Sequence, residues 1–203
     1  MNAKLYGILD LGYVTEERAI FTAAKMLEGG VGLLQFRAKG HSPEGLLGLA
    51  KELKALCQTA NVPFIVNDHP LLAKACGANG VHVGQDDLSV AETRDLVGPG
   101  MMIGKSTHSL AQAIAAIEEE PDYIGFGPLF ATATKPDYVP VGLSDIRAAH
   151  EAVSLPIFCI GGIKRENLPE VIAAGARRVV IVSGILQAPE IVAYCRDCLD
   201  LLG

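Results

Sequence analysis

The sequence predicts a single-domain α/β protein, a (β/α)8 TIM barrel that spans residues 1–203, and three observations support this fold. Eight apolar runs of strand length recur along the chain, each is followed by a segment with helical spacing, and roughly 200 residues is enough for such a barrel. Most of the runs are continuously hydrophobic, as expected for parallel strands that are covered on both faces. An open doubly wound sheet shows the same alternation, but eight units in this length favour closure.

The predicted elements follow one another at even spacing. The strands comprise residues 5–9, 32–36, 64–66, 80–83, 101–104, 123–126, 157–160 and 179–182. The helices comprise residues 15–28, 43–60, 70–76, 89–97, 109–119, 144–152, 165–174 and 189–201. Helix starts are predicted at Ser42, which precedes a proline, at Ser109, which begins a capping box ending at Gln112, and at Ser144. Glycines stand where helices are expected to end, at positions 29, 30, 77, 98 and 175.

The composition argues against several classes of protein. A net charge of −6 and a pI near 5.3 do not suit a nucleic-acid-binding surface. The N-terminal apolar run is too short for a membrane span or a signal peptide, so we expect a cytoplasmic protein without membrane contacts. The five cysteines are odd in number and scattered, which favours reduced thiols, and the pair Cys195 and Cys198 is expected to pack within the last helix. The sequence does not fix the oligomeric state.

Polar residues follow the second strand, where a barrel builds its active site. Gln35, Arg37 and Lys39 alternate and can share one side of an extended segment. A guanidinium fork and an ammonium group in this arrangement suit a phosphate or pyrophosphate. A solvated strand end is the alternative, and we favour anion binding because other anion features fall on the same face of the barrel.

Carboxylates follow the third and fourth strands. Asp68 and Asp87 could supply the one or two carboxylates with which proteins usually hold Mg²⁺. Asp86 competes with Asp87, and a turn or a helix cap is an alternative role for each. No cluster of histidines accompanies them, so a zinc site is not expected. His82 lies inside the fourth strand and is predicted to be a packed core histidine.

Hydroxyl and basic side chains follow strands five and six. Ser106 is favoured as an anion ligand over a nucleophile because no G-x-S-x-G turn is present. His108 either caps the next helix or orients the loop. The long loop after strand six carries Thr132, Thr134 and Lys135, which either face an anion or belong to a proline-stiffened turn.

Glycines follow the last two strands at the positions where many barrels bind phosphate. Gly161 and Gly162 follow strand seven, and Ser183 and Gly184 follow strand eight. Backbone N–H groups in such loops can approach a phosphate closely because glycine has no side chain. The residues thus predict two anion sites on one face, one of them next to a candidate metal site.

Taken together, the motifs resemble the thiamine phosphate synthase family from the first strand to the last. Two departures are His69, where many relatives have arginine, and the first-strand segment Gly7-Ile8-Leu9-Asp10, which stands in place of the commoner Ile-Thr-Asp ending. The matching segments are Gln35-x-Arg37-x-Lys39, Asn67-Asp68, the run 80–87, the run 106–109, the run 125–128 with Thr132-x-Thr134-Lys135, the run 160–163, and Val182-Ser183.

The resemblance implies a role for each site residue. It implies that Asp68 and Asp87 hold Mg²⁺. The residues implied to contact the aminopyrimidine pyrophosphate are Gln35, Arg37, Lys39, Asn67, Ser106 and Lys135. The residues implied to receive the thiazole phosphate are Thr132, Thr134, Gly162, Val182 and Ser183. Phe36, Ala38 and Ala133, which lie within the same segments, are expected to bind substrate as well. The catalytic groups among them are Arg37, Lys39, Ser106 and Lys135.

The implied reaction is an alkyl transfer between two small molecules. Pyrophosphate leaves the pyrimidine methylene, and the thiazole nitrogen captures the resulting carbocation. Three alternatives stay open at this point: a thiazole tautomerase-like paralogue, a Schiff-base aldolase that uses Lys105 or Lys135, and a non-catalytic sensor of thiamine precursors.

Overall fold

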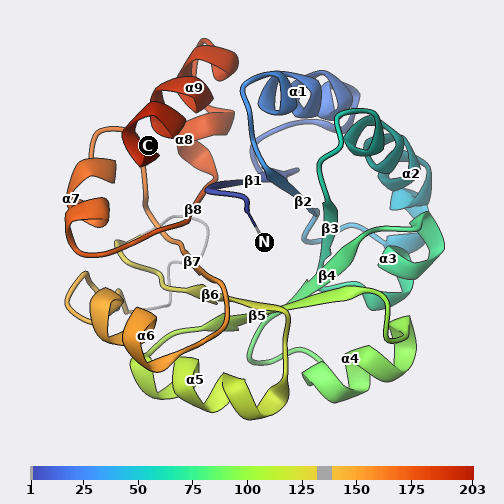
Figure 1. Ribbon diagram of the computed structural model, residues 1–203. Coiled ribbons are helices and arrows are strands. Elements are labelled where there is room, and N and C mark those ends of the chain that lie inside the picture. Colours follow the sequence, from blue (N-terminus) through green and yellow to red (C-terminus); the bar gives the residue numbers. More distant parts are fainter. Residues whose placement is uncertain (1, 132–138) are drawn as a thin grey trace.

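The computed structural model describes residues 2–131 and 139–203, which form a closed barrel of eight parallel strands (Figure 1). The strands pair in chain order, and β8 pairs with β1 to close the barrel. The strands are β1 (Leu5–Asp10), β2 (Leu33–Arg37), β3 (Phe64–Asn67), β4 (Gly80–Val83), β5 (Met102–Thr107), β6 (Tyr123–Phe126), β7 (Ile157–Cys159) and β8 (Val179–Ile181). The helices are α1 (Glu16–Glu28), α2 (Pro43–Thr59), α3 (Pro70–Cys76), α4 (Val90–Val97), α5 (Leu110–Ala115), the 3-10 helix η1 (Ala116–Glu119), α6 (Ile146–Ala152), α7 (Leu168–Ala173), α8 (Ser183–Leu186) and α9 (Ile191–Leu202).

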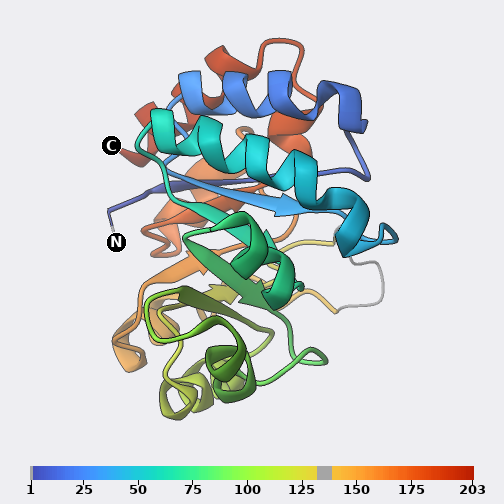
Figure 2. The ribbon, with the colours of Figure 1, turned by 90° about the vertical axis from the view of Figure 1, so that its right-hand side faces the viewer.

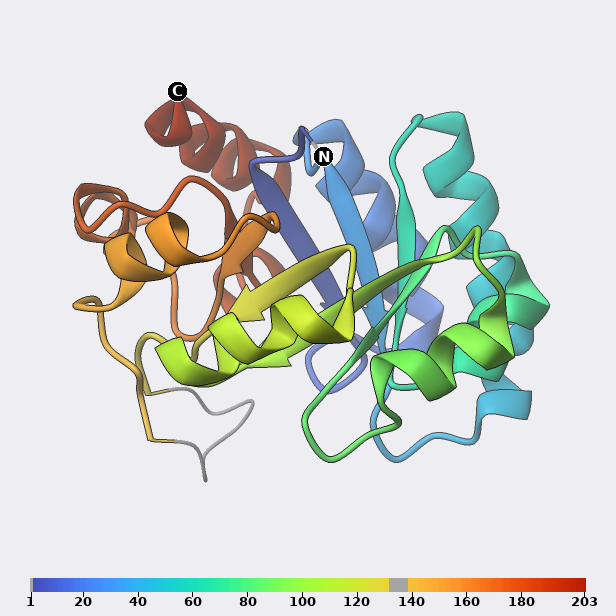
Figure 3. The same cartoon turned by 60° about the horizontal axis from the view of Figure 1, so that its bottom comes forward.

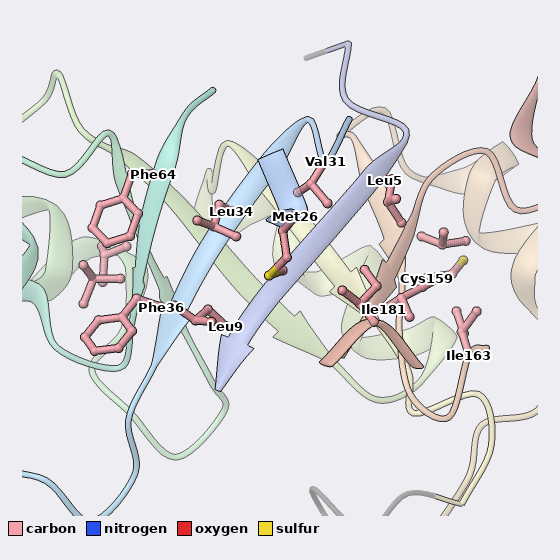
Figure 4. Close-up of a cluster of buried hydrophobic side chains, with 14 of the residues drawn as sticks. Leu5, Leu9, Met26, Val31, Leu34, Phe36, Phe64, Cys159, Ile163 and Ile181 are labelled. Atoms are coloured by element: carbon pink, nitrogen blue, oxygen red, sulfur yellow. The ribbon is translucent and has the colours of Figure 1, made fainter. Parts of the chain in front are cut away.

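Side chains along each strand alternate between two cores, as the pleat of a strand requires. Leu9, Leu34 and Phe36 point outward into the core between the strands and the helices (Figure 4). A second, smaller core fills the barrel interior. It consists of Tyr6, Ile8, Leu33, Ile65, Tyr123, Phe158 and Val180. This interior core matters for function because several of its members also form the floor of the pocket described below.

The predicted order of eight strand and helix units is confirmed. Each predicted strand is present within one or two residues at its start, and β5 extends to Thr107, three residues beyond its predicted end. The glycine stops are also confirmed, for example at Gly77, where the backbone is left-handed with φ 68°. The short helix α8 was not predicted, because its four residues carry no helical periodicity.

The predicted helix starts are partly confirmed. The Ser42 hydroxyl accepts the Gly45 N–H, as expected for a cap. Ser109 accepts the Gln112 N–H, but the Gln112 side chain accepts the N–H of His108, so the capping box does not close. The helix predicted to begin at Ser144 is present as α6 but begins two residues later, after Asp145 and without a side-chain cap.

A complete capping box that the sequence analysis missed begins α4. The Ser89 hydroxyl accepts the Glu92 N–H, and the Glu92 carboxylate accepts the N–H of Ser89. This box leaves Asp87 free of the helix-capping role that was one alternative for it.

Both chain ends lie at the face opposite to the carboxyl ends of the strands (Figure 2). Lys4 donates a hydrogen bond to the Gly203 carbonyl at that face. Helices α4 and α5 cover the near side of the barrel in Figure 3. Cys195 and Cys198 are buried on α9 with free thiols, which confirms the packing role predicted for them. Among the described residues, no helix is both long and apolar enough to span a membrane.

Candidate active site

A pocket opens at the carboxyl ends of the strands, and every strand or its following loop contributes to the wall. The predicted site residues that line this pocket are Gln35, Arg37, Asn67, Ser106, Gly162, Val182 and Ser183. The structure thus brings side chains from β2, β3 and β5 together with the loops after β7 and β8. The expected contacts at Thr132, Ala133, Thr134 and Lys135 fall outside the residues that the structure describes.

Two members of the predicted substrate-binding segment turn away from the pocket. Phe36 and Ala38 are 2% and 5% exposed and belong to the outer core, because alternate residues of β2 and its extension face the helices. Substrate contacts from Phe36 and Ala38 therefore stay a prediction, and in this structure only their backbone groups could make such contacts.

Arg37 is held in place by an acidic residue that the sequence analysis did not assign to the site. Its guanidinium donates to the Asp10 carboxylate at the neighbouring end of β1, and the two residues pair in register. The other Asp10 oxygen accepts the Gly12 N–H at 2.9 Å. Asp10 is 1% exposed. The sequence carried no signal for this pairing, because an acidic residue at the end of a strand does not identify its partner on the neighbouring strand.

The two predicted metal ligands face each other beside the pocket. The loop after β4 fixes Asp87, whose carboxylate accepts the Gly84 N–H at 2.7 Å. Asp68 has a left-handed backbone with φ 60°, and its carboxylate lies 3.8 Å from the exposed Lys39 ammonium. Burial raises the pKa of the Asp68 carboxyl, and the negative charge of Asp87 raises it further, while Lys39 opposes the shift.

This donor set fits a divalent cation that keeps most of its water. Two carboxylates that repel each other would be stabilised by a cation between them. The described residues contain no group of three or more His, Cys, Asp or Glu side chains that could hold a metal. Mg²⁺ needs only one or two carboxylates when water and phosphate oxygens complete its shell, so the arrangement fits Mg²⁺ better than zinc.

The floor of the pocket contains a chain of polar side chains that the sequence analysis missed. Gln35 donates to the Tyr6 hydroxyl at 2.6 Å, and the hydroxyls of Tyr6 and Tyr123 are 3.0 Å apart. The Tyr123 hydroxyl is 3.2 Å from Nδ1 of His82, and Nε2 of His82 is 2.9 Å from the Ser106 hydroxyl.

The role predicted for His82 is therefore corrected. It lines the pocket and is not a purely packed core residue. The alternation of β4 held the signal for this placement, because His82 lies between Val81 and Val83, which are buried on the other side of the sheet.

His108 orients the loop after β6, which was one of its two predicted roles. Its Nδ1 is 2.6 Å from the Gly127 carbonyl oxygen. The Ser106 hydroxyl contacts His82 and lies in a β-strand, not in a strained turn. This geometry is in keeping with the preference for hydrogen bonding over a nucleophilic role.

The loops after β7 and β8 are held by contacts from behind. Gly162 has φ 66°, and its carbonyl accepts a hydrogen bond from the Asn167 side chain at 3.0 Å. The Tyr194 hydroxyl on α9 accepts the Arg165 N–H at 2.7 Å. A Cβ added at Gly184 would lie 2.5 Å from the same hydroxyl, so Tyr194 touches both loops.

The loops after β6 and β7 are joined backbone to backbone. The N–H groups of Leu129 and Phe130 donate to the carbonyls of Ile160 and Gly161 at 2.8 and 3.1 Å. A Cβ at Gly161 would lie 2.4 Å from the Cα of Pro128, a separation that real Cβ atoms essentially never show. Glycine at position 161 therefore permits two things: the close approach of the loops after β6 and β7, and the left-handed backbone conformation.

Lys105 does not reach the pocket. Its side chain is 6% exposed, does not line the pocket, and pairs at 3.5 Å with Glu119 of η1 in the helix layer. The alternation of β5 places it on the opposite side from Ser106. This position removes Lys105 as a Schiff-base nucleophile for a substrate in the pocket.

Comparisons with known proteins agree with this geometry. The sequence model of a family described as thiamine monophosphate synthase matches residues 5–185. The thiamine-phosphate synthase of Synechococcus sp. (strain WH7803) is 47% identical over 92% of this chain, which spans 53% of that longer relative. That of Shouchella clausii (strain KSM-K16) is 42% identical over 94% of this chain and 91% of the relative. Among solved structures, a thiamine phosphate pyrophosphorylase from Pyrococcus furiosus superposes with a TM-score of 0.90 at 28% identity, over 98% of this chain and 95% of that one.

Proposed function

The chain belongs to the thiamine monophosphate synthase family, and we propose that it condenses 4-amino-2-methyl-5-hydroxymethylpyrimidine pyrophosphate with 4-methyl-5-hydroxyethylthiazole phosphate, or its carboxylated form, to thiamine phosphate. The observation that carries the proposal is that one pocket is lined by residues from both of the groups predicted to bind anions. Gln35, Arg37, Asn67 and Ser106 form one wall, and Gly162, Val182 and Ser183 form the other.

The proposed reaction needs no protein nucleophile. The bond between the pyrimidine methylene and the pyrophosphate breaks, and the thiazole nitrogen supplies the electron pair of the new bond to that methylene carbon. Arg37 and Lys39 would stabilise the negative charge that develops on the leaving pyrophosphate, and Ser106 would donate a hydrogen bond. Lys135 is proposed as a third cation on the family resemblance alone. A carbocation would have to be kept from water, and the apolar side chains on the pocket floor, such as Ile8 and Phe158, would help to do so.

Mg²⁺ is proposed as the cofactor, with Asp68 and Asp87 as its protein ligands. When bound, the cation would neutralise the charge of the pyrophosphate and help it leave. The raised pKa of Asp68, which burial and the facing Asp87 carboxylate produce, supports this assignment because a bound cation would relieve the repulsion. Asp68 and Asp87 also count against the tautomerase-like alternative, since both anionic ligands are retained.

The first experiment is pyrophosphate release in the presence of both substrates and Mg²⁺, with thiamine phosphate identified by mass. Controls omit either substrate or include EDTA. Release that needs both substrates and the metal would establish the proposal. Folded protein that makes no thiamine phosphate would overturn it, and isomerisation of the thiazole or binding without turnover would then identify a tautomerase or a sensor. Loss of activity after borohydride treatment with substrate would point to a Schiff base.

The metal assignment is tested separately with Asp68→Asn and Asp87→Asn. Asparagine tolerates the left-handed backbone at position 68, so the change removes charge with little strain. Each variant should raise the Mg²⁺ concentration for half-maximal rate by more than about tenfold, since even outer-shell losses cost about 10 to 100-fold in metal affinity. Asp86→Asn is the matched control, and a larger effect there than at position 87 would reassign the ligand.

A further inference from the structure

The polar chain across the pocket floor connects side chains from five strands of the barrel. It begins at Gln35 on β2, passes through the hydroxyls of Tyr6 on β1 and Tyr123 on β6, and reaches His82 on β4 and Ser106 on β5. Four contacts of 2.6 to 3.2 Å connect the five side chains. Tyr6 and Tyr123 are 1% and 0% exposed, so water does not compete for their hydroxyls.

Gln35, at one end of this series of hydrogen bonds, fixes the direction of every bond in the series. The Gln35 nitrogen can only donate, so the Tyr6 oxygen accepts and the Tyr6 proton is available for Tyr123. Tyr123 then donates to Nδ1 of His82.

The remaining proton of the neutral imidazole consequently lies on Nε2, from which it is donated to the Ser106 oxygen. The reverse direction would leave the Tyr6 proton without an acceptor among the residues that the structure describes. A buried hydroxyl proton without an acceptor is costly, so the first direction is favoured.

We propose that Tyr6, Tyr123 and His82 are positioning residues that hold Ser106 as a hydrogen-bond donor toward the pocket. The Ser106 oxygen accepts from His82, which leaves its own proton for an acceptor atom on the bound molecule. Such an acceptor is a ring nitrogen or a phosphate oxygen. The identity of that molecule as the pyrimidine pyrophosphate rests on the proposed function.

The chemistry of the two tyrosines supports this arrangement. Burial raises the pKa of Tyr6 and of Tyr123, so both hydroxyls keep their protons throughout the working range of pH. The surrounding rings hold them in place, since Phe158 lies edge-on to Tyr6 and Tyr123 at centroid distances of 5.2 and 5.6 Å. Gly104 leaves room for the chain, because a Cβ there would lie 2.2 Å from the Tyr123 ring.

The direction of the chain is tested by the tautomer of His82. The protein is labelled with ¹⁵N-histidine, and the His82 signals are identified by their loss in His82→Gln. In mildly alkaline buffer the wild type should carry the proton on Nε2. Tyr123→Phe removes the donor to Nδ1 and should yield a mixed or reversed tautomer of His82. Tyr6→Phe leaves that donor in place, so the proton of His82 should stay on Nε2. A wild-type proton on Nδ1, or a tautomer unchanged in Tyr123→Phe, would overturn the inference.

The role in binding is tested by steady-state kinetics of the same variants. Tyr123→Phe should raise KM for the pyrimidine pyrophosphate about fivefold, as expected for the weakening of one hydrogen bond, and leave KM for the thiazole phosphate unchanged. Phe158→Leu is the control, because it loosens the same aromatic cluster without removing a hydroxyl. Equal changes in both KM values, or the same pattern in the control, would contradict a positioning role. A protein with the expected tautomer but no synthase activity would refute the proposed function, while the inferred direction of the hydrogen bonds would still hold.

Discussion

At the scale of single residues, the site depends on charges that are buried next to partners. Asp10 is the clearest case, since its carboxylate faces the Arg37 guanidinium where little water reaches either group. A buried ion pair contributes little net stability when both members are present, but removal of one member leaves an uncompensated charge. Asp10 therefore orients Arg37, which is proposed to bind pyrophosphate, and a substitution that removes the Asp10 charge is expected to destabilise the protein.

Asp10→Asn should lower the free energy of unfolding by about 3 kcal/mol, because Arg37 loses its counter-charge. Asparagine can still accept the Gly12 N–H, so the variant isolates the charge. Urea unfolding measures the change. The double variant Asp10→Asn/Arg37→Gln is the control, and it should be less destabilised than the sum of the two single variants. Strict additivity would show that the pair is not coupled.

His150 on α6 gives the protein a sensitivity to acid that is separate from the site. Burial lowers its pKa, with Arg177 and Arg178 adding to the shift, and its Nε2 has no hydrogen-bond partner among the described residues. The unfolded chain, with an ordinary pKa near 6.5, therefore binds this proton more readily than the folded chain. The contribution of neutral His150 to the free energy of unfolding is fully present above about pH 6.5. It is lost as the pH falls toward and through the lower pKa of His150 in the folded protein, with a slope of at most about 1.4 kcal/mol per pH unit.

His150→Leu and His150→Gln should both flatten the fall of stability between about pH 6.5 and 5. Urea unfolding across that range is the measurement. Leucine and glutamine differ in packing and polarity but neither titrates, so the two variants should share the altered slope even if their stabilities at pH 7.5 differ. A slope that matches wild type in both would assign the acid sensitivity to other groups.

At the scale of elements, α9 supports two loops of the pocket although none of its residues line it. Tyr194 accepts the Arg165 N–H behind the β7 loop and lies against Gly184 of α8. The helix thereby sets the relative position of the two loops that are proposed to receive the thiazole phosphate.

Tyr194→Phe should raise KM for the thiazole phosphate about fivefold, since the loss of one hydrogen bond is worth about 1 kcal/mol. KM for the pyrimidine pyrophosphate should stay the same. Cys195→Ala on the same helix is the control for packing loss, because Cys195 is buried and lies against Gly29 at the end of α1. An equal rise of both KM values in Tyr194→Phe would indicate general loosening of the barrel.

The elements also show what the sequence could and could not predict. The order of strands and helices was predictable because each unit carries its own hydrophobic run and the runs do not depend on one another. The residues that follow each strand were predictable as a site because a barrel collects them at one face. Side-chain contacts between strands were not predictable. Tyr6 and Tyr123, whose hydroxyls pair, are separated by 117 positions, and in the sequence each looks like an ordinary strand residue.

The same reasoning explains the correction at His82. It was predicted to be a core residue because it lies inside a strand, whereas a strand sends neighbouring side chains to opposite faces. Strict alternation along β4 would have placed His82 on the side opposite to Val81 and Val83.

At the scale of the whole molecule, the chain ends and the pocket occupy opposite faces of the barrel (Figure 2). Lys4 reaches the carbonyl of Gly203, so a short linker can join the ends without crossing a strand. The exposed turn at Pro99 and Gly100, between α4 and β5, belongs to the face of the chain ends. We therefore expect the closed sheet to form from a chain that begins at this turn.

A circular permutant that opens between Pro99 and Gly100 and joins the old ends by a glycine and serine linker should fold and keep its activity. Circular dichroism and pyrophosphate release are the measurements. A permutant opened between Gly161 and Gly162 is the control, and it should lose activity because the cut divides a pocket loop. Loss of folding in the first permutant would show that the β1 to β8 closure needs the native order of synthesis.

The backbone contacts between the loops after β6 and β7 also affect how the sequence can diverge. Gly161 leaves no space beside Pro128, and the neighbouring amides of Leu129 and Phe130 are bonded to the other loop. A side chain acquired at position 161 must therefore be accompanied by a shift of the segment around position 128. Substitutions in these two loops are expected to be accepted as pairs, so this wall of the pocket diversifies more slowly than loops that change one residue at a time.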